Sequence, residues 1–483
     1  MTSTQRMTLI AAILGSSIAA IDGTIINVAL PAIQADLGGG LQAQQWIANA
    51  YTLTLGSLIL IGGSLGDIYG KRRVFAIGIA SFGVLSLLCA VAPTSETLIA
   101  ARALQGAAGA LLAPSSLAII VAAFDAGERG KAIGSWTAWG GIAIIVGPLV
   151  GGVIVDQTSW RWIFAINVPL VLLTLALVRS AVPDLPTTRR RVDFLGAGLV
   201  GLGLAAIVFG LIEQPNYGWG SPIILGALSG GVILLGAFVA YEQRASHPML
   251  RLDLFARRNF ALANLETLSM YAGLSILFFF LFIFLQEVAG YSALKAGLTT
   301  IPSTLIMFAL SSRMGALADR HGPRLFLTGG PLLAAAGILL FLRTGIETSY
   351  VGDLLPALIV FSLGLTMTVA PLTATVLADA DVDDAGIASA INNAIARCAG
   401  LIGVSAIGAV VSGRLPGNTF APNSGSVAAF HTAIVICAVL VGLGGVIAFL
   451  GIRDPARVVK AEECPGGQLA GTPRAAVAES QPA

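Results

Sequence analysis

The sequence predicts an all-α polytopic membrane protein with fourteen transmembrane helices. Composition, the spacing of apolar runs and the placement of basic residues all support this fold class. Hydrophobic residues make up 56% of the 483 residues and charged residues only 11%, whereas roughly 25% of the residues in soluble domains are charged. The 58 glycines suit helices that pack closely in lipid. A soluble multidomain protein is therefore excluded.

Fourteen apolar runs are long enough to cross a bilayer, which takes about 20 residues of helix. The first six centre near Ala19, Gly56, Phe82, Gly109, Ile145 and Val171, a pair covers about 194–212 and 222–241, and six more centre near Leu277, Ile306, Ala335, Leu365, Gly400 and Val439. The predicted domains are a six-helix bundle at 1–180, a linker with two extra transmembrane helices at 181–258, a second six-helix bundle at 259–452 and a disordered cytoplasmic tail at 453–483.

The basic residues predict the orientation, because Lys and Arg accumulate in cytoplasmic loops. With the N-terminus inside, 21 of the 27 basic residues fall in cytoplasmic segments, four fall outside and two lie within spans. One cytoplasmic loop is acidic instead, with Asp379, Asp381, Asp383 and Asp384, but acidic residues count little in this rule. The first apolar run exceeds the length of a signal peptide. We therefore expect a multi-pass protein of the plasma (inner) membrane, with both termini in the cytoplasm.

Several function classes find no support in the sequence. The net charge of +2 does not indicate nucleic-acid binding, and Cys89, Cys398 and Cys437 lie in apolar runs without metal-ligand spacing. The three histidines are scattered, and neither a nucleophile–His pair, a nucleotide-binding loop nor a loop of catalytic-domain length is present. We expect no enzyme activity, metal or cofactor, and a monomer. Energy for transport would come from an ion gradient and not from ATP.

A short motif recurs in the two predicted bundles. Residues 63–73 read GSLGDIYGKRR and residues 315–324 read GALADRHGPR, each after the second span of a six-span unit. One such loop is equally well explained by a tight turn with surface charge, but two copies at equivalent positions indicate a duplicated bundle. Paired repeats are typical of alternating-access transporters, which bind substrate near the midplane between the halves.

Four charged residues fall inside the apolar runs: Asp22, Arg102, Glu266 and Arg397. A charge at the centre of a membrane helix is unfavourable by about 2.5–3.5 kcal/mol on insertion scales, and such residues usually face a polar interior with a function there. Asp22 is the most informative of the four, because burial disfavours the charged form of a carboxyl group and so suits a group that must gain and lose a proton.

The motifs resemble the major facilitator superfamily over about residues 8–452, and within it the fourteen-span drug:proton antiporters of the QacA/EmrB type. The matching segments are 63–73 for the loop signature, 22–31 for the first helix, 102–109 for the fourth and 147–152 for the fifth, where Ala143 replaces the usual leading glycine. The resemblance implies the major facilitator fold, with two six-helix bundles plus two extra transmembrane helices. It also implies a conformational latch at Gly63, Asp67, Gly70, Lys71, Arg72, Asp319 and Arg320, and an antiport motif that packs through Gly147, Pro148, Gly151 and Gly152.

Residue type and family position make Asp22 and Arg102 a candidate proton-coupling pair, and the alternative is a static ion pair that fixes helix packing. Glu266 could carry a second proton or attract a cationic substrate, or it could reach interfacial water or pair with Arg257 or Arg258 at the helix end. Arg397 is expected to be structural or to orient the substrate, because arginine does not deprotonate in proteins. The predicted substrate cavity comprises Asn27, Tyr51, Gln105, Glu266, Asn393 and Arg397.

The sequence thus favours a proton-coupled antiporter that exports amphipathic organic compounds, cationic or neutral, by alternating access. The alternative on the same scaffold is a dedicated exporter of one endogenous metabolite, lipid or siderophore. An uptake symporter and a receptor or scaffold are weaker alternatives. The predicted tenth span, about 294–317, has no acidic residue in its apolar body, which favours monovalent or neutral substrates over dications. Glu213 and Glu287 fall at outer helix ends and are expected to be solvated.

Overall fold

The computed structural model describes residues 1–184, 187, 192–245, 248–378 and 385–454, and its described residues form helices and no strand. Fourteen helical segments among them are long and apolar enough to cross a membrane, which confirms the predicted number of spans. The acidic loop at 379–384 and all but the first two residues of the predicted tail lie outside the described residues.

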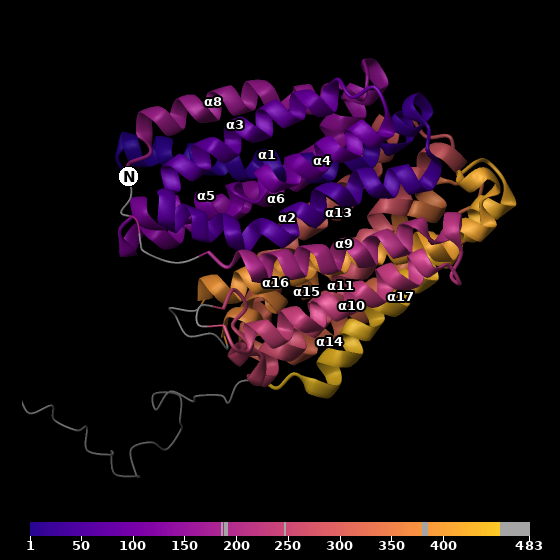
Figure 1. Ribbon diagram of the computed structural model, residues 1–483. Helices are drawn as coiled ribbons and strands as arrows, with labels where there is room; N and C mark the ends of the chain where they lie inside the picture. The colour runs from indigo at the N-terminus through magenta and orange to yellow at the C-terminus, as the bar shows by residue number, and fades with distance from the viewer. Residues whose placement is uncertain (185–186, 188–191, 246–247, 379–384, 455–483) are drawn as a thin grey trace, which may run out of the picture.

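The first bundle contains six spans, two of which are broken into consecutive helices. Its helices are α1 (Ser3–Leu37), α2 (Gly40–Tyr69), α3 (Lys71–Ala90), α4 (Ser95–Gly109), α5 (Leu112–Ala123), α6 (Ala126–Gln157), α7 (Trp162–Ala165) and α8 (Asn167–Ala181). Figure 1 shows these helices together on one side of the molecule, with α1 and α4 in their midst. One hydrophobic core of this bundle contains buried residues such as Ile18, Phe75, Phe82 and Val171.

The second bundle also contains six spans, and the largest hydrophobic core runs through both bundles, with residues such as Leu30 and Phe164 of the first bundle and Phe284 and Phe430 of the second. Its helices are α11 (Arg258–Ile283), which continues as a short π-helix Phe284–Val288, α12 (Ala293–Thr299), α13 (Ile301–His321), α14 (Pro323–Leu339), α15 (Leu355–Ala378), α16 (Ala385–Val411) and α17 (Ser424–Gly451). Phe284 and Phe430 stack in this core with ring centroids 4.1 Å apart. Much of the aromatic run 278–284 is therefore core packing.

The two extra helices, α9 (Phe194–Tyr217) and α10 (Pro222–Glu242), lie against the junction of the bundles. Helix α9 packs on α2 of the first bundle and on α16 of the second, whereas α10 packs mainly on α9. The side chains of Leu204, Val208 and Ile212 form a cluster with Leu401 of α16. Trp46 of α2 adds a hydrogen bond of 2.8 Å to Glu213 of α9. Helices α9 and α10 thus cover the outer side of the α2–α16 junction.

The bundles are joined by hydrogen bonds at the end of the molecule opposite the start of α1 and the end of α17, here called the distal end. Asp156 of α6 accepts hydrogen bonds of 2.9 Å from the backbone N–H groups of Ala293 and Leu294 of α12, and Gln44 of α2 donates one of 3.1 Å to Glu287. Gln286, Gln45 and Asn49 add further bonds between the bundles in this half of the molecule. At the terminal end, no hydrogen bond or ion pair joins described residues of the two bundles.

The repeated motif has the same backbone geometry in both bundles. Gly70 separates α2 from α3 with φ 92°, and Gly322 separates α13 from α14 with φ 90°. A side chain is disfavoured at such positive φ values, so glycine allows one helix to follow another across a single residue. The shared geometry supports the internal duplication that the sequence indicates.

Candidate functional site

The centre of the first bundle holds an ion pair between Asp22 of α1 and Arg102 of α4. Nη1 of Arg102 donates a hydrogen bond to Oδ2 of Asp22, and both side chains are 0% exposed. Asp22 lies on the buried face of α1, and Arg102 on the face of α4 turned toward α1 and α2. Asp22 and Arg102 are therefore in contact, as predicted. Their role in proton coupling stays a prediction.

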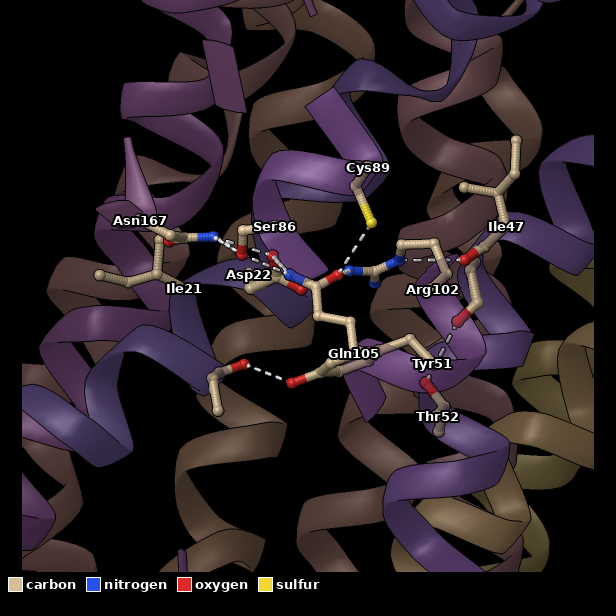
Figure 2. A network of polar contacts seen from close by, with 12 residues as sticks. Ile21, Asp22, Ile47, Tyr51, Thr52, Ser86, Cys89, Arg102, Gln105 and Asn167 are labelled. Atoms are coloured by element: carbon tan, nitrogen blue, oxygen red, sulfur yellow. Dashed lines mark hydrogen bonds and ion pairs between the residues drawn. The ribbon is translucent and has the colours of Figure 1, made fainter. Parts of the chain in front are cut away.

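Three polar side chains complete the surroundings of this pair (Figure 2). Nε2 of Gln105 lies 3.0 Å from Oδ1 of Asp22 and 2.9 Å from Oγ of Ser86. Its Oε1 accepts a hydrogen bond of 2.7 Å from Arg102. Nδ2 of Asn167 donates to the same Asp22 oxygen over 3.2 Å and to Ser86 over 3.3 Å. Asp22 thus accepts hydrogen bonds from three residues, Arg102, Gln105 and Asn167.

Arg102 is also held by groups on α2. Its Nε donates to the carbonyl oxygen of Ile47 over 3.3 Å, and its guanidinium lies 4.2 Å from the centre of the Tyr51 ring. The Tyr51 hydroxyl donates to the carbonyl oxygen of Ala19, on α1. One nitrogen, Nη2, is buried without a hydrogen-bond partner among the described residues. The pair therefore links α1, α2 and α4, but its hydrogen bonding is incomplete on the arginine side.

The predicted cavity residues differ in exposure. Tyr51 and Gln105 are buried at 2% and 0% exposure within the first bundle, so contact with a substrate stays a prediction for both. Asn27 and Arg397 are partly exposed, and Asn393 is exposed. Helix α16 therefore presents an accessible polar face, whereas the Asp22 network is closed in this conformation.

Glu266 lies in the second bundle, apart from the Asp22 network. Its side chain is 0% exposed, and neither carboxyl oxygen has a hydrogen-bond partner among the described residues. The neighbouring helix is α17, where a Cβ on Gly444 would lie 3.4 Å from Cγ of Glu266. Arg258 donates instead to the carbonyl oxygens of Gly451 and Leu450. The suggested contact with interfacial water or with Arg258 is therefore not found.

The glycines of the antiport motif allow close contacts on two sides of α6. A Cβ on Gly147 would lie 2.1 Å from Oγ1 of Thr24, and one on Gly151 would lie 2.5 Å from Ile25, both on α1. Gly152 and Pro148 instead face α12, where a Cβ on Gly152 would meet the backbone of Leu294 at 2.6 Å and a Cβ on Gly297 would meet the Pro148 carbonyl oxygen at 2.6 Å. The motif thus joins α6 to its own bundle and to the other.

The residues of the predicted latch stay within their own bundles in this conformation. Lys71 pairs with Asp67 over 3.5 Å, and Arg72 pairs with Asp184 over 3.1 Å. Gly63 packs near Pro114 of α5. Among the described residues, Asp319 and Arg320 form no ion pair. The role of these residues in holding the bundles together stays a prediction for another conformation.

Sequence reasoning missed several residues that the structure brings together. Asn167 and Ser86 are polar residues within the sixth and third apolar runs. Their polarity at these positions was the only sequence feature that could have indicated their place in the network. Asp156 and Gln44 gave none, because their partners lie in the other bundle, far along the chain. Glu287 was expected to be solvated, but it lies partly buried between the bundles and accepts a hydrogen bond from Gln44. Among the described residues, no group of three or more His, Cys, Asp or Glu side chains could hold a metal ion.

Two six-helix bundles, an added helix pair and a charged network in the membrane interior define a polytopic membrane transporter fold. The model of the Major Facilitator Superfamily matches residues 12–404. The chain belongs to this superfamily, whose members are transporters and not enzymes.

Curated relatives are similar over most of their length. The puromycin resistance protein of Streptomyces alboniger is 39% identical over 402 residues, which cover 81% of this chain and 79% of the relative. The probable actinorhodin transporter of Streptomyces coelicolor is 35% identical, with 85% and 73% covered. The multidrug resistance protein Stp of Mycobacterium tuberculosis is 33% identical, with 85% and 77% covered.

Solved structures share the fold at low sequence identity. A D-xylose–proton symporter matches with a TM-score of 0.65 and 18% identity, covering 94% of this chain and 99% of its own. A bacterial homologue of the human lysosomal transporter Spinster, described as inward-facing and unoccupied, matches with a TM-score of 0.65 and 16% identity, covering 93% and 97%. These likenesses confirm the major facilitator fold that the sequence predicted.

Proposed function

We propose that this protein is a proton-coupled antiporter that exports amphipathic organic compounds by alternating access, and that Asp22 carries the coupling proton. The observation that carries the proposal is the fully buried Asp22–Arg102 pair with its three-residue hydrogen-bond shell. The named roles of the relatives, which include puromycin resistance and multidrug resistance, support export of small organic compounds.

The pair gives a physical route from proton binding to a change of conformation. Protonation of Asp22 removes its charge and leaves Arg102 as a buried cation without a counter-ion. Breaking a buried pair in this way is unfavourable by about 3–5 kcal/mol. Reversing a two-state equilibrium from 1:99 to 99:1 takes about 5.5 kcal/mol. One proton at this site therefore supplies most of the free energy needed to favour a second arrangement of the bundles.

The proposed orientation places both termini in the cytoplasm, as the basic residues predict. The distal end is then the outer end. Hydrogen bonds join the bundles there through Asp156, Gln44 and Glu287, so the structure corresponds to a conformation closed toward the outside. Residues 1–180 and 259–452 would move as the two bodies, and the latch motifs would meet when the inner end closes.

Glu266 is proposed as a second proton carrier. An ionised carboxylate with no hydrogen-bond partner in an apolar interior is strongly unfavourable, and Glu266 has no such partner among the described residues. Attraction of a cationic substrate fits this placement less well, because the side chain lies against α17 and is not exposed. Asp22 and Glu266 would then place one proton site in each bundle.

Dedicated export of one metabolite is the second candidate function. The observation that favours it is the similarity to the probable actinorhodin transporter, whose name specifies a single product. A screen of many compounds distinguishes the two: several structurally unrelated transported compounds support multidrug export, and a single one supports the dedicated exporter.

The proposed coupling is tested in inverted membrane vesicles by substrate-induced proton release, with puromycin, the cation ethidium and the anion pyrenebutyrate added separately, so that whichever probe is transported reports the coupling. The wild type should release protons on substrate addition, and Asp22→Asn should not. Asp36→Asn is the matched control, because Asp36 also lies on α1 but pairs with Arg161 at the distal end. Proton release that is unchanged in Asp22→Asn would exclude Asp22 as the coupling site.

A further inference from the structure

Arg397 differs from the other charged residues near the middle of the spans. Asp22, Arg102 and Glu266 are each 0% exposed, whereas Arg397 is partly exposed. No described residue forms an ion pair or hydrogen bond with Arg397, and its Nε is buried without a partner. The side chain as a whole is partly exposed, and its terminal nitrogens form no hydrogen bond with a described residue. The guanidinium of Arg397 is thus a partly desolvated cation whose N–H groups have no hydrogen-bond partner among the described residues.

The neighbours of α16 indicate which way Arg397 points. Cys398, Leu401 and Ile402 belong to the cluster with α9 that covers the outer side of the junction. Asn392 and Gly400 face α11, through Asn264 and Ser275 respectively. Arg397 lies between these two faces, with its Cβ 3.6 Å from the position of a Cβ on Gly56 of α2. The side chain therefore lies where the two bundles meet, on the inner side of the junction.

Exposure along this face increases toward the terminal end of the molecule. Val404, whose carbonyl oxygen accepts a hydrogen bond from Gln45 of α2, is buried, Arg397 is partly exposed and Asn393 is exposed. The terminal end is also where no hydrogen bond or ion pair joins described residues of the bundles. A ligand that enters from that end would meet Asn393 first and the guanidinium of Arg397 one helical turn further in.

The chemistry of a guanidinium determines which ligand group fits there. Arginine stays charged in proteins and has only hydrogen-bond donors, and a desolvated charge without a partner is unfavourable. Its planar fork binds carboxylate, sulfonate or phosphate oxygens through paired hydrogen bonds. The described carboxyl groups of Asp22 and Glu266 within the spans are both fully buried, so neither can contact a cationic ligand at this interface.

We propose that Arg397 binds an acidic group of the substrate, so that the preferred cargo is an amphipathic oxyanion and not a cation. This inference rests on the proposed export function and specifies its substrate class. The sequence alone favoured a cationic or neutral substrate. The accessible charge at the bundle interface is the positive charge of Arg397, and this charge favours an anionic substrate instead.

The test compares three probes with the same pyrene group: pyrenebutyrate, its methyl ester and a pyrenylbutyl-trimethylammonium. Binding is measured by tryptophan-to-pyrene energy transfer on the purified full-length protein in phosphatidylcholine nanodiscs, with empty nanodiscs subtracted. The wild type should bind the acid about 10- to 100-fold more tightly than the ester or the cation, the range expected for hydrogen bonds to charged groups. Arg397→Gln should lose this preference and keep the ester affinity.

Two further variants separate a binding role from a structural one. Arg397→Lys keeps the charge but not the planar fork, so it should retain part of the preference for the acid. Arg343→Gln removes an exposed positive charge of the second bundle away from the α2–α16 junction and should retain all of it. Equal or tighter binding of the cation by the wild type, no binding of the acid, or an unchanged preference in Arg397→Gln would each overturn the proposal.

Adding phosphatidylglycerol to the nanodiscs identifies the source of the oxyanion. Competition with pyrenebutyrate would assign the site to an acidic lipid headgroup, and absence of competition would assign it to a free small molecule; both outcomes keep the oxyanion site. Because binding needs no proton gradient, this test is independent of the coupling test. Proton-driven export of ethidium with no binding of the acid would overturn this inference alone, and binding of the acid without proton release would overturn the proposed coupling alone.

Discussion

Asn167 donates a hydrogen bond from Nδ2 to Oδ1 of Asp22 over 3.2 Å, although the two residues lie 145 positions apart in the chain. The bond connects the start of α8 with the middle of α1 inside the first bundle. A neutral amide that donates to a carboxylate stabilises its charged form without adding a second cation. Asn167 therefore belongs to the hydrogen-bond network that holds the carboxylate of the proposed coupling site.

Replacing Asn167 with leucine should move the pH dependence of transport upward. The variant removes one donor from the Asp22 carboxylate, so the protonated form gains relative to the charged form. We expect the midpoint of substrate-induced proton release to move to higher pH in vesicles titrated from pH 5 to 9.

Ser86→Ala is the matched control for this prediction. Ser86 accepts hydrogen bonds from Asn167 and Gln105 but does not contact Asp22 through a hydrogen bond of its own. Its loss leaves the donors to Asp22 in place, so the midpoint should move by less than it does in Asn167→Leu. Equal shifts in the two variants would show that general disturbance of the bundle, and not the lost donor, changes the pH dependence.

The contact between Asp156 and the start of α12 should bias the protein toward the distally closed conformation. Asp156→Ala removes both hydrogen bonds with the backbone of Ala293 and Leu294. At about 1 kcal/mol net for such a contact, the distally open population should rise about five-fold. Distances between spin labels on the distal ends of α2 and α11, measured by double electron–electron resonance, report this change.

Asp36→Ala provides the comparison for Asp156→Ala. Asp36 is a distal carboxylate with similar bonding, to Trp160 over 3.0 Å and to Arg161 over 2.5 Å, but both partners belong to its own bundle. Its removal should change the stability of the first bundle and leave the distance distribution between bundles unchanged. If Asp36→Ala opened the distal end as much as Asp156→Ala, the α6–α12 contact would have no special role.

Glu266→Gln should lower the number of protons released per transported molecule and leave folding stability nearly unchanged. The carboxyl group has no hydrogen-bond partner among the described residues, so the nearly isosteric amide loses no contact. A structural role predicts the opposite result, a lower midpoint of thermal unfolding with unchanged proton release. Glu96→Gln, at the exposed start of α4, is the control for removal of one carboxylate.

The sequence was sufficient for the fold because each span is a local feature of about 20 residues, and because two copies of one motif marked the duplication. Residue type together with the family resemblance also predicted Asp22 and Arg102 as a pair, and the structure brings the two side chains into contact. The remaining network could not be derived. Asn167 is one polar residue among many, and the distal contact of Asp156 uses backbone N–H groups, which leave no pattern in the sequence.

Exposure was the property that the sequence described least well. Gln105 and Arg397 are both predicted to line the substrate cavity, but the structure buries Gln105 beside Arg102 in the first bundle. Arg397 is partly exposed between the bundles. Periodicity identifies the polar side of a helix, but whether that side faces its own bundle or the other depends on packing angles that only the three-dimensional arrangement sets.

The glycines of the antiport motif allow a direct test of close packing between α6 and α1. A methyl group on Gly147 would lie 2.1 Å from Oγ1 of Thr24, whereas one on Gly140, two turns earlier on α6, would meet no atom of a described residue within 4 Å. Gly147→Ala should therefore destabilise the first bundle by about 1–3 kcal/mol through overpacking, and Gly140→Ala should not, since alanine favours helix over glycine. Unfolding is followed by reaction of a maleimide dye with Cys89, which is fully buried in this bundle, after Cys398, Cys437 and Cys464 are replaced by serine. Equal unfolding midpoints for the two alanine variants would contradict the close approach of α6 and α1 at Gly147.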